Sequence, residues 1–415
     1  MKSDQQGQGE SGFVLLGFAE ALSSPEVAWS LVDAGFRVGA FSRRGRKSAL
    51  QHSRYVTIFD ITVPETDFQA ARADLATVLR NCPVNGGAQQ SVLFPLDDVA
   101  LWLCAHKPLP PKWVLAGPTA AGTELALDKC IQVKAAGKAG LPVPVTTIAE
   151  TTAEVLRCVC DFPLILKPAK AVIAGDTCLR KGANWICANR QELDSALSQW
   201  REEYPLVVQP YITGVGVGVF GFAGVRGVEC WSAHRRLRMM NPHGSGSSAC
   251  ASRAVPENLK GPIQRMILEN GWRGLFMVEL LQDGGGQYWF VEFNGRPWGS
   301  MALSRRQGLE YPAWNTRLAL NPDFSVRRSE STQSEVVCRN LGRELMHLLF
   351  VLRGRKSRAI EKWPSFWRSV ADVLFIRSRD CFYNFRRDDW RVFFSDCFCT
   401  IRDQISKPRK QAQKA

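Results

Sequence analysis

The N-terminal part of the chain alternates short apolar runs with amphipathic stretches. FVLLGF (13–18), RVGAFSR (37–43) and SVLFPL (91–96) have the length and apolar content of buried strands, and a helix is predicted over 25–34. Strands that alternate with helices favour a parallel sheet with crossover helices. We therefore expect an open α/β domain over residues 13–118.

The pattern changes after Gly117-Pro118. A helix is predicted to begin there, to contain Asp128 and Lys129, and to end at Gly140, because the following LPVP cannot continue it. Strands then dominate. They are predicted at FPLILKP (162–168), PLVVQPYI (205–212) and VECWSAHRRLR (228–238), with a glycine-rich stretch at TGVGVGVFGFAG (213–224) and a loop at NPHGSGSSA (241–249).

Two strands near residue 285 carry candidate chemistry. GLFMVELL and QYWFVEFN flank the turn sequence QDGGG, which places Glu279 and Glu292 on neighbouring antiparallel strands. Residues two apart in a strand share one face, so Glu292, Asn294 and Arg296 form a row. Oxygen ligands beside a guanidinium suit a divalent cation with phosphates attached. The alternative is the solvated face of an amphipathic strand.

The remaining pattern is helical. Helices are predicted at about 258–270 and from about Met301 to Gly308, where Tyr311-Pro312 is expected to end the second one. From about residue 331 the chain is rich in interleaved aromatic and arginine residues and is predicted to be helical.

Composition places the chain among soluble globular proteins, with 45% hydrophobic and 22% charged residues. No run of about 20 apolar residues could span a bilayer, and the polar start has no signal-type apolar core, so a cytoplasmic protein is expected. The 13 cysteines have no finger-type spacing with histidines and are expected to be free thiols.

Positive charge concentrates at the C-terminal end. Residues 331–415 hold 18 Lys and Arg against 9 Asp and Glu, which is most of the net charge of +14. A basic module with aromatic residues can stack nucleic-acid bases. A solvated surface beside a helical core is the preferred interpretation, and no nucleic acid partner is expected.

The order of these segments resembles the ATP-grasp superfamily, in particular the ATP-binding domains of carbamoyl-phosphate synthetase and biotin carboxylase. DKCIQVKAAGKAGLPVP, FPLILKPA, VVQPYITGVGVGV and GLFMVELL…YWFVEFNGRPWGS carry the resemblance, which covers about residues 13–325. It implies α/β and α+β units: a disordered N-terminus (1–12), a pre-ATP-grasp domain (13–118), an ATP-grasp domain (119–328, with a small lobe at about 140–212 and a large lobe at about 213–328), a basic helical C-terminal extension (329–405) and a tail (406–415).

The resemblance also implies site residues. ATP would be bound by Lys129, Lys167 and the backbone of a hinge formed by Gln209, Pro210, Tyr211 and Ile212; Mg²⁺ or Mn²⁺ would be held by Glu279, Glu292 and Asn294; and Arg296 would stabilise the transferring phosphoryl group. Trp298 is expected to pack rather than to react. Gly299-Ser300 would begin a helix.

Two segments depart from the family pattern. Relatives often have an acidic residue at the hinge and another shortly after it, where this chain has Gln209 and the sequence TGVG. The loop after Lys167 contains Gly175 as its only glycine before Gly182, so either this loop or HGSGSSA (243–249) would close over the phosphates. In TGVGVGV a flexible turn into a strand is preferred to a phosphate cradle.

The implied activity is that of an ADP-forming carboxylate–amine or carboxylate–thiol ligase using ATP and Mg²⁺. A small-molecule carboxylate and a nucleophile would be its substrates, with His234, Arg235 or Arg236 meeting the acid, and a homodimer is left open. The alternative is a non-catalytic ATP-binding regulator or assembly factor that keeps the fold.

Overall fold

The structure is a computed structural model that describes residues 12–82, 90–106, 108–159, 161–244, 246–326, 335–355, 359–360, 362–377 and 380–412. Apart from Gly12, the predicted disordered N-terminus lies outside these residues. Residues 413–415 of the predicted tail also lie outside them. The backbone of residues 406–412, assigned to the tail from the sequence, instead continues the last helix.

The N-terminal unit is an open parallel sheet, as expected. Its strands are β1 (Phe13–Gly17), β2 (Arg37–Arg43), β3 (Val56–Ile61), β4 (Ser91–Pro95) and β5 (Trp113–Leu115), in the order β3-β2-β1-β4-β5. The connections contain α1 (Ser24–Asp33), the short 3-10 helix η1 (Ala49–His52), α2 (Phe68–Asn81) and α3 (Asp98–Ala105). Because the order reverses beside β1, the carboxyl ends of β1 and β4 form the switch point at which such sheets bind ligands.

The helix predicted to contain Asp128-Lys129 is two helices. α4 (Ala121–Leu127) ends at Asp128, and α5 (Lys129–Lys138) begins after it. The Asp128 carboxylate accepts hydrogen bonds from the N–H groups of Cys130 and Ile131, so it caps α5. The prediction of one continuous helix was wrong, because it treated a capping aspartate as an interior residue.

A small four-stranded sheet follows, in the order β10-β7-β11-β6. Its strands are β6 (Thr147–Ala149), β7 (Leu164–Pro168), β10 (Trp185–Cys187) and β11 (Leu206–Pro210), and its core is shared with α6 (Thr152–Cys158) and α7 (Arg190–Trp200). The segment after Lys167 forms a separate hairpin of β8 (Ile173–Ala174) and β9 (Leu179–Arg180).

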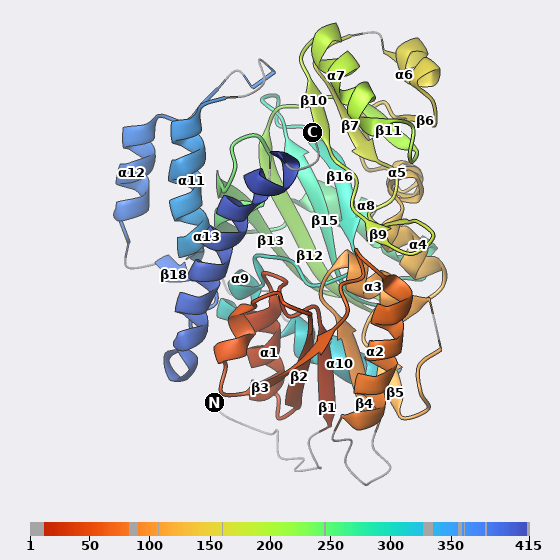
Figure 1. The fold of residues 1–415 in the computed structure, drawn as a ribbon, viewed down its shortest axis with the longest axis vertical. Coiled ribbons are helices and arrows are strands. Elements are labelled where there is room, and N and C mark those ends of the chain that lie inside the picture. The colour runs from red at the N-terminus through yellow and green to blue at the C-terminus, as the bar shows by residue number, and fades with distance from the viewer. Residues whose placement is uncertain are drawn as a thin grey trace.

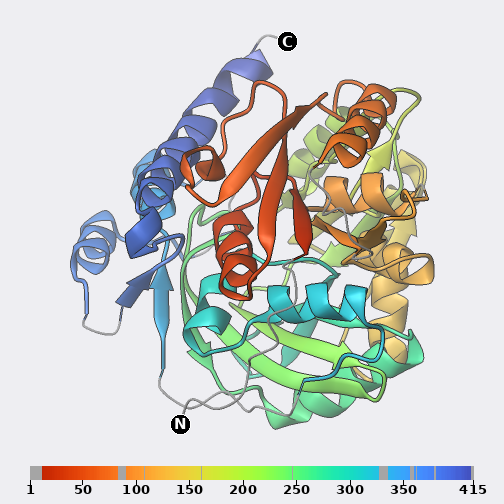
Figure 2. The ribbon, with the colours of Figure 1, turned by 90° about the horizontal axis from the view of Figure 1, so that it is seen from below.

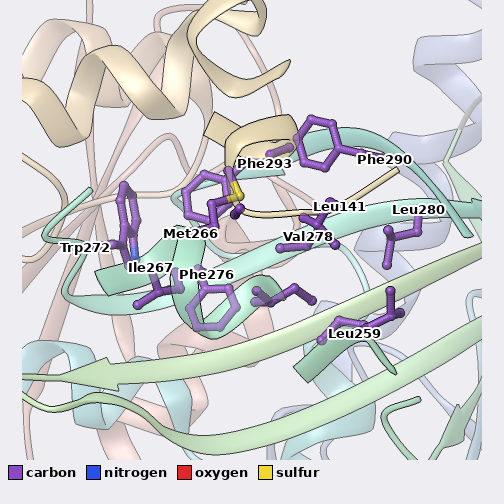
Figure 3. Close-up of a cluster of buried hydrophobic side chains, with 14 of the residues drawn as sticks. Leu141, Leu259, Met266, Ile267, Trp272, Phe276, Val278, Leu280, Phe290 and Phe293 are labelled. Carbon is purple, nitrogen blue, oxygen red and sulfur yellow. The ribbon is translucent and has the colours of Figure 1, made fainter. Parts of the chain in front are cut away.

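The large sheet has the order β16-β15-β12-β13-β14-β17-β18. Its first five members are β12 (Val215–Gly224), β13 (Gly227–Met239), β14 (Ser247–Arg253), β15 (Gly274–Gln282) and β16 (Tyr288–Asn294). One face is apolar and packs on α8 (Glu257–Glu269). Figure 3 shows Leu259 and Ile267 of α8 close to Phe276, Val278 and Leu280 of β15. Alternation along the strands therefore leaves the opposite face for other side chains.

Tyr311 and Pro312 begin a helix instead of ending one. α9 (Met301–Arg306) is short, and α10 (Tyr311–Leu320) starts with the Tyr-Pro pair in its first turn. Proline is tolerated there because the first N–H groups of a helix have no intrahelical acceptor. Asn315 of α10 donates to the Ala116 carbonyl and accepts from the Leu275 N–H, so α10 ties the N-terminal unit to the large sheet.

The C-terminal extension is mostly helical, as expected, but it also contributes two strands. Its elements are β17 (Val337–Arg339), α11 (Leu341–Arg353), α12 (Phe366–Leu374), β18 (Asp380–Phe382), the 3-10 helix η2 (Arg387–Asp389) and α13 (Arg391–Ala412). β17 pairs with β14, so the extension continues the large sheet at its edge. Figures 1 and 2 show α13 lying along the N-terminal unit, where the Asp389 carboxylate accepts from Trp29 Nε1 at 2.9 Å.

Within the described part of the chain, no helix combines the length and the apolar content that a membrane span requires.

Candidate functional site

Five neighbouring strands place one residue each in a row across the large sheet. Glu292 of β16 pairs with Glu279 of β15, Glu279 with Gly218 of β12, Gly218 with His234 of β13, and His234 with Ser252 of β14. Paired residues on adjacent strands share a face. The row therefore lies on the face opposite the α8 core, and the two glutamates are direct neighbours.

Two glycines of β12 make room for the side chains of β13. A Cβ on Gly218 would lie 2.8 Å from His234 Nε2, and one on Gly216 would lie 2.6 Å from Arg236 Cδ. Arg236 consequently crosses β12 and forms an ion pair with Glu279 on β15. We expected a flexible turn into a strand for this glycine-rich stretch. The strand begins at Val215, so Gly216 and Gly218 belong to it.

We expect Gly216→Ala to destabilise the protein, because the new Cβ would force Arg236 off its path. The free energy of unfolding should fall by about 1–3 kcal/mol, as for other overpacked buried sites. Urea unfolding followed by tryptophan fluorescence measures it. Gly284→Ala is the matched control, because a Cβ there meets no atom within 4 Å. Equal stability of the two variants would contradict the packing argument.

The structure brings the predicted metal ligands together. Glu279 and Glu292 face each other across two paired strands, and Asn294 Nδ2 donates to Glu292 Oε1 at 3.1 Å. Among the described residues, no group of three or more His, Cys, Asp or Glu forms a metal cluster. Two carboxylates and one amide oxygen nevertheless fit Mg²⁺, which takes few protein ligands and completes its shell with phosphate oxygens and water.

Lys167 reaches this face from the small lobe. Its Nζ donates to Gln209 Oε1 at 3.2 Å, and Gln209 Nε2 donates to Thr146 Oγ1 at 2.8 Å. Burial lowers the pKa of Lys167 to about 8, although the charge of Glu292 opposes this shift. Lys129 adds to the lowering, so both predicted phosphate-binding lysines lie within electrostatic reach of each other.

The predicted hinge is the end of β11 and the residues after it. The Gln209 side chain is occupied by Lys167 and Thr146, as described above. Pro210 pairs with Leu164, and Tyr211 N–H donates to the Pro163 carbonyl. Ile212 lies between the end of β11 and the start of β12. The hinge backbone therefore connects the two sheets, and its contact with an adenine stays a prediction.

Arg296 has a partner that the sequence did not indicate. Asp98, at the start of α3, accepts from Arg296 Nε at 2.5 Å and from Nη2 at 3.2 Å. Burial would raise the pKa of Asp98, but the Arg296 guanidinium outweighs burial and holds it below its ordinary value. The signal was the pair Asp97-Asp98 directly after an apolar strand, where a switch-point ligand site is expected.

The same switch point holds a cluster of carboxylates around Arg43. Its guanidinium contacts Glu65 at 3.0 Å and Asp97 at 3.2 Å, and its N–H donates to Glu20. Burial raises the pKa of Glu20 to about 7, against the attraction of Arg43. Sequence analysis missed this cluster because its members come from segments that are far apart in the chain.

The three candidate substrate residues of β13 have different surroundings. His234 is buried, its Nδ1 lies 2.8 Å from Ser300 Oγ, and burial lowers its pKa to about 3, so its ring is neutral. Arg236 lies on the same face. Arg235 points the other way and pairs with Glu335 at the surface, which separates it from the site.

Arg238 and Trp298 have structural partners. A register irregularity separates Arg236 from Arg238, and Arg238 donates to both oxygens of the Glu344 carboxylate through Nε and Nη2. Trp298 is buried and stacks on Phe220 with ring centroids 4.4 Å apart, in agreement with the packing role that we expected. The ion pair with Glu344 and the stacking on Phe220 give both side chains a structural role.

The alternative closing loop is only partly a loop. Ser247, Ser248 and Ala249 belong to β14, and Ala249 pairs with Arg238 on one side and Arg339 on the other. A residue held between two strands cannot close over a ligand without breaking the sheet. The hypothesis that 243–249 acts as the closing segment was therefore wrong for its second half, and residue 245 lies outside the described chain.

No protein-family model matches the sequence, and no curated protein matches it either. The structure is similar to an L-amino acid ligase from Bacillus licheniformis, with a TM-score of 0.55, 16% identity and 76% of each chain covered. It is also similar to the biotin carboxylase domain of 2-oxoglutarate carboxylase from Hydrogenobacter thermophilus, determined with MgADP, ADP and bicarbonate, with a TM-score of 0.59, 15% identity and coverage of 80% of this chain and 74% of that one.

A third similar structure is the N5-carboxyaminoimidazole synthetase from Staphylococcus aureus in complex with ADP. The TM-score is 0.56 and the identity 13%, over 79% of this chain and 81% of that one. At these identities the comparison concerns the fold. The parallel N-terminal sheet, the small lobe and the large, mainly antiparallel sheet follow the architecture predicted from the sequence. The chain has the ATP-grasp fold.

Proposed function

We propose that this protein is a ligase that uses ATP and Mg²⁺ to activate a carboxylate as an acyl phosphate, which an amine or another nucleophile then attacks. One observation carries the proposal. Glu279, Glu292 and Asn294 lie together on one face of the large sheet, and Lys167 of the small lobe interacts electrostatically with Glu292.

Phosphoryl transfer needs positioning and charge neutralisation more than covalent chemistry from the protein. Lys167 and Lys129 would bind the phosphates of ATP as point charges. Glu279, Glu292 and Asn294 would hold Mg²⁺, for which Mn²⁺ could substitute. When bound, the metal ion would supply positive charge that neutralises the phosphates of ATP. The residues of the chain would orient the acid.

Arg296 would stabilise the oxygens of the transferring group. Its planar donor fork already binds the Asp98 carboxylate through two hydrogen bonds, which is the geometry it would offer to a substrate carboxylate or phosphoryl group. For Arg296 to bind substrate, Asp98 must give up at least one of these bonds. Asp98 would then keep Lys181 as a charge partner, since Lys181 Nζ lies 4.0 Å from Asp98 Oδ2.

A non-catalytic ATP-binding regulator is the second candidate. The observation that favours it is that two key arginines are already paired within the chain, Arg236 with Glu279 and Arg296 with Asp98. Such pairs would have to exchange partners in a catalytic cycle. A regulator that only binds ATP would not require this exchange.

Isotope transfer separates the two candidates. The purified protein is incubated with MgATP and a panel of acids and amines, and release of ADP is followed. For any acid that supports turnover, ¹⁸O in its carboxylate should appear in the released phosphate, because the acyl phosphate passes one oxygen to it. Saturable MgATP binding without ADP release over the whole panel would favour the regulator.

We expect MgATP binding to weaken as the pH rises through 8. Lys167 has a lowered pKa of about 8, so its charged form is present below that pH and is lost above it. If only the charged form binds, the apparent Kd should rise about tenfold between pH 7 and pH 9. Calorimetry measures the Kd. Lys167→Arg should flatten this dependence, because arginine stays charged over the whole range; an equal pH slope in both proteins would contradict the assignment.

A further inference from the structure

The C-terminal extension adds side chains to one end of the polar face of the large sheet. Arg236 of β13 pairs with Cys250 of β14 in the sheet register. Tyr383, which follows β18, faces the Cys250 thiol, and Arg343 of α11 interacts electrostatically with Arg236, Cys250 and Tyr383. Residues more than 100 positions apart in the sequence therefore meet at one place, beside the Arg236–Glu279 ion pair.

Arg343 has no carboxylate partner at this place. Its Nη1 donates to the Ser247 carbonyl at 3.2 Å, but within the described residues no carboxylate oxygen lies within 4 Å of its guanidinium. Asp396 is near enough to attract it, yet the Asp396 carboxylate accepts from Asn340 Nδ2 at 2.8 Å. Burial lowers the pKa of Arg343 from its ordinary value, as expected for a cation that lacks a close counter-ion.

Two further polar atoms at this end of the face, Arg236 Nε and His234 Nε2, are buried and have no hydrogen-bond partner among the described residues. The buried Tyr383 hydroxyl interacts only with the weakly hydrogen-bonding Cys250 thiol there. His234 and Tyr383 are only 3% and 2% exposed. Buried polar groups are normally hydrogen-bonded, so a cluster without partners indicates a ligand that supplies them.

The charges of this cluster specify the ligand. Two guanidinium groups, from Arg236 and Arg343, meet here. Among the described residues Glu279 is the carboxylate in direct contact with one of them, and Glu292 and Asp396 attract them from further away. Burial raises the pKa values of Cys250 and Tyr383, which keeps the thiol and the phenol neutral and able to donate. The available donors and the two adjacent guanidinium groups suit an anionic oxygen group.

We propose that Arg343 and Tyr383 of the extension, together with Arg236 and His234, form a subsite for a second anionic group, a carboxylate or a phosphate, on the acid substrate. This inference rests on the proposed function. β15 and β13 are two strand spacings apart, roughly 10 Å. Arg236 spans this distance to reach Glu279, so the subsite extends from the carboxylates proposed to hold the metal towards Arg343 and Tyr383. The substrate would be an acid with a second anionic group several bonds away from the first.

A purely structural role makes a different prediction. If Arg343 only donated a hydrogen bond to the Ser247 carbonyl and attracted Asp396, its substitution would lower the stability of the protein. The relative affinities for different ligands would stay unchanged. The test therefore has to measure a preference between ligands. Glutarate and pentanoate are suitable probes because they have the same chain length and differ only in the second carboxylate.

The experiment is calorimetry on the full chain with glutarate, pentanoate and inorganic phosphate. In the unchanged protein we expect glutarate to bind at least tenfold more tightly than pentanoate. Arg343→Met should remove that preference, since a hydrogen bond to a charged group is worth roughly a 10- to 100-fold change in affinity. Tyr383→Phe, which keeps the buried ring, should weaken glutarate and phosphate binding about three- to tenfold and leave pentanoate binding unchanged.

Arg353→Met is the matched control, because Arg353 is an exposed arginine at the other end of the same helix. It should preserve the preference. An unchanged preference in Arg343→Met and Tyr383→Phe, or none in the unchanged protein, would overturn the subsite. If Arg343→Met does not fold by circular dichroism, Tyr383→Phe decides the question. MgATP binding is titrated in the same samples, and its absence would count against the proposed function, whereas the glutarate preference is measured without nucleotide.

Discussion

Replacing Glu292 with glutamine is expected to reduce ATP turnover on the order of 10²–10³-fold, because a charge that stabilises the transferring phosphates would be lost from a preorganised site. Glutamine has nearly the same shape, and its Oε1 can still accept from Asn294 Nδ2. The fold should therefore survive. Steady-state ADP release under saturating MgATP measures the effect, and urea unfolding shows whether stability is retained.

The same substitution has a second readout that a merely structural glutamate would not give. The charge of Glu292 raises the pKa of Lys167, against the larger lowering by burial. Without it, the pKa of Lys167 should fall below about 8, and the loss of MgATP affinity should begin at lower pH. Glu257→Gln, at an exposed glutamate of α8, is the control and should change neither quantity. Turnover similar to the unchanged protein would overturn the assignment of Glu292.

The parts of the site that could be predicted are those in which local sequence determines geometry. Glu279 and Glu292 flank a glycine-rich turn, and alternation in a hairpin places them on one face. The structure makes them direct register partners, which turn length alone did not specify. Lys167 was identifiable because an apolar strand ends beside it.

The parts that could not be predicted depend on contacts between distant segments. Asp98 meets Arg296 across 198 positions, and Arg238 meets Glu344 across 106. No periodicity in one segment contains this information. Gly216 and Gly218 are a related case. Their alternate spacing was visible, but its reason, the passage of Arg236 and His234 over β12, appears only when β13 is placed beside β12.

The helix boundaries show how local signals compete. Asp128 was placed inside a predicted helix because its neighbours favour helix. Pro312 was expected to end a helix because proline cannot continue one. In the structure Asp128 caps α5, and Pro312 occupies the first turn of α10. Both residue types favour helix starts. If the helix-start preference of each residue had been considered beside its helix-ending preference, the sequence would have predicted α10 and the break before α5.

The largest effect on stability is expected at Glu344, where the extension joins the large sheet. Its carboxylate is 1% exposed and binds both Arg238, at 2.8 Å, and Arg339, at 2.9 Å. Arg339 is itself buried and also contacts Asp380 of β18 at 3.1 Å. Glu344→Gln would leave Arg238 without its carboxylate partner and Arg339 with Asp380 alone, and breaking a buried pair of this kind costs about 3–5 kcal/mol.

Urea unfolding should show this loss, whereas Glu335→Gln, which removes an exposed partner of Arg235, should change stability by less than about 1 kcal/mol. Equal effects would contradict the network. Glu344 and Arg343 are consecutive residues of α11, so a change at Glu344 can also affect the proposed subsite. If the network anchors α11, Glu344→Gln should weaken glutarate binding without touching any residue of the proposed subsite. The extension would then be coupled to the site through one buried carboxylate.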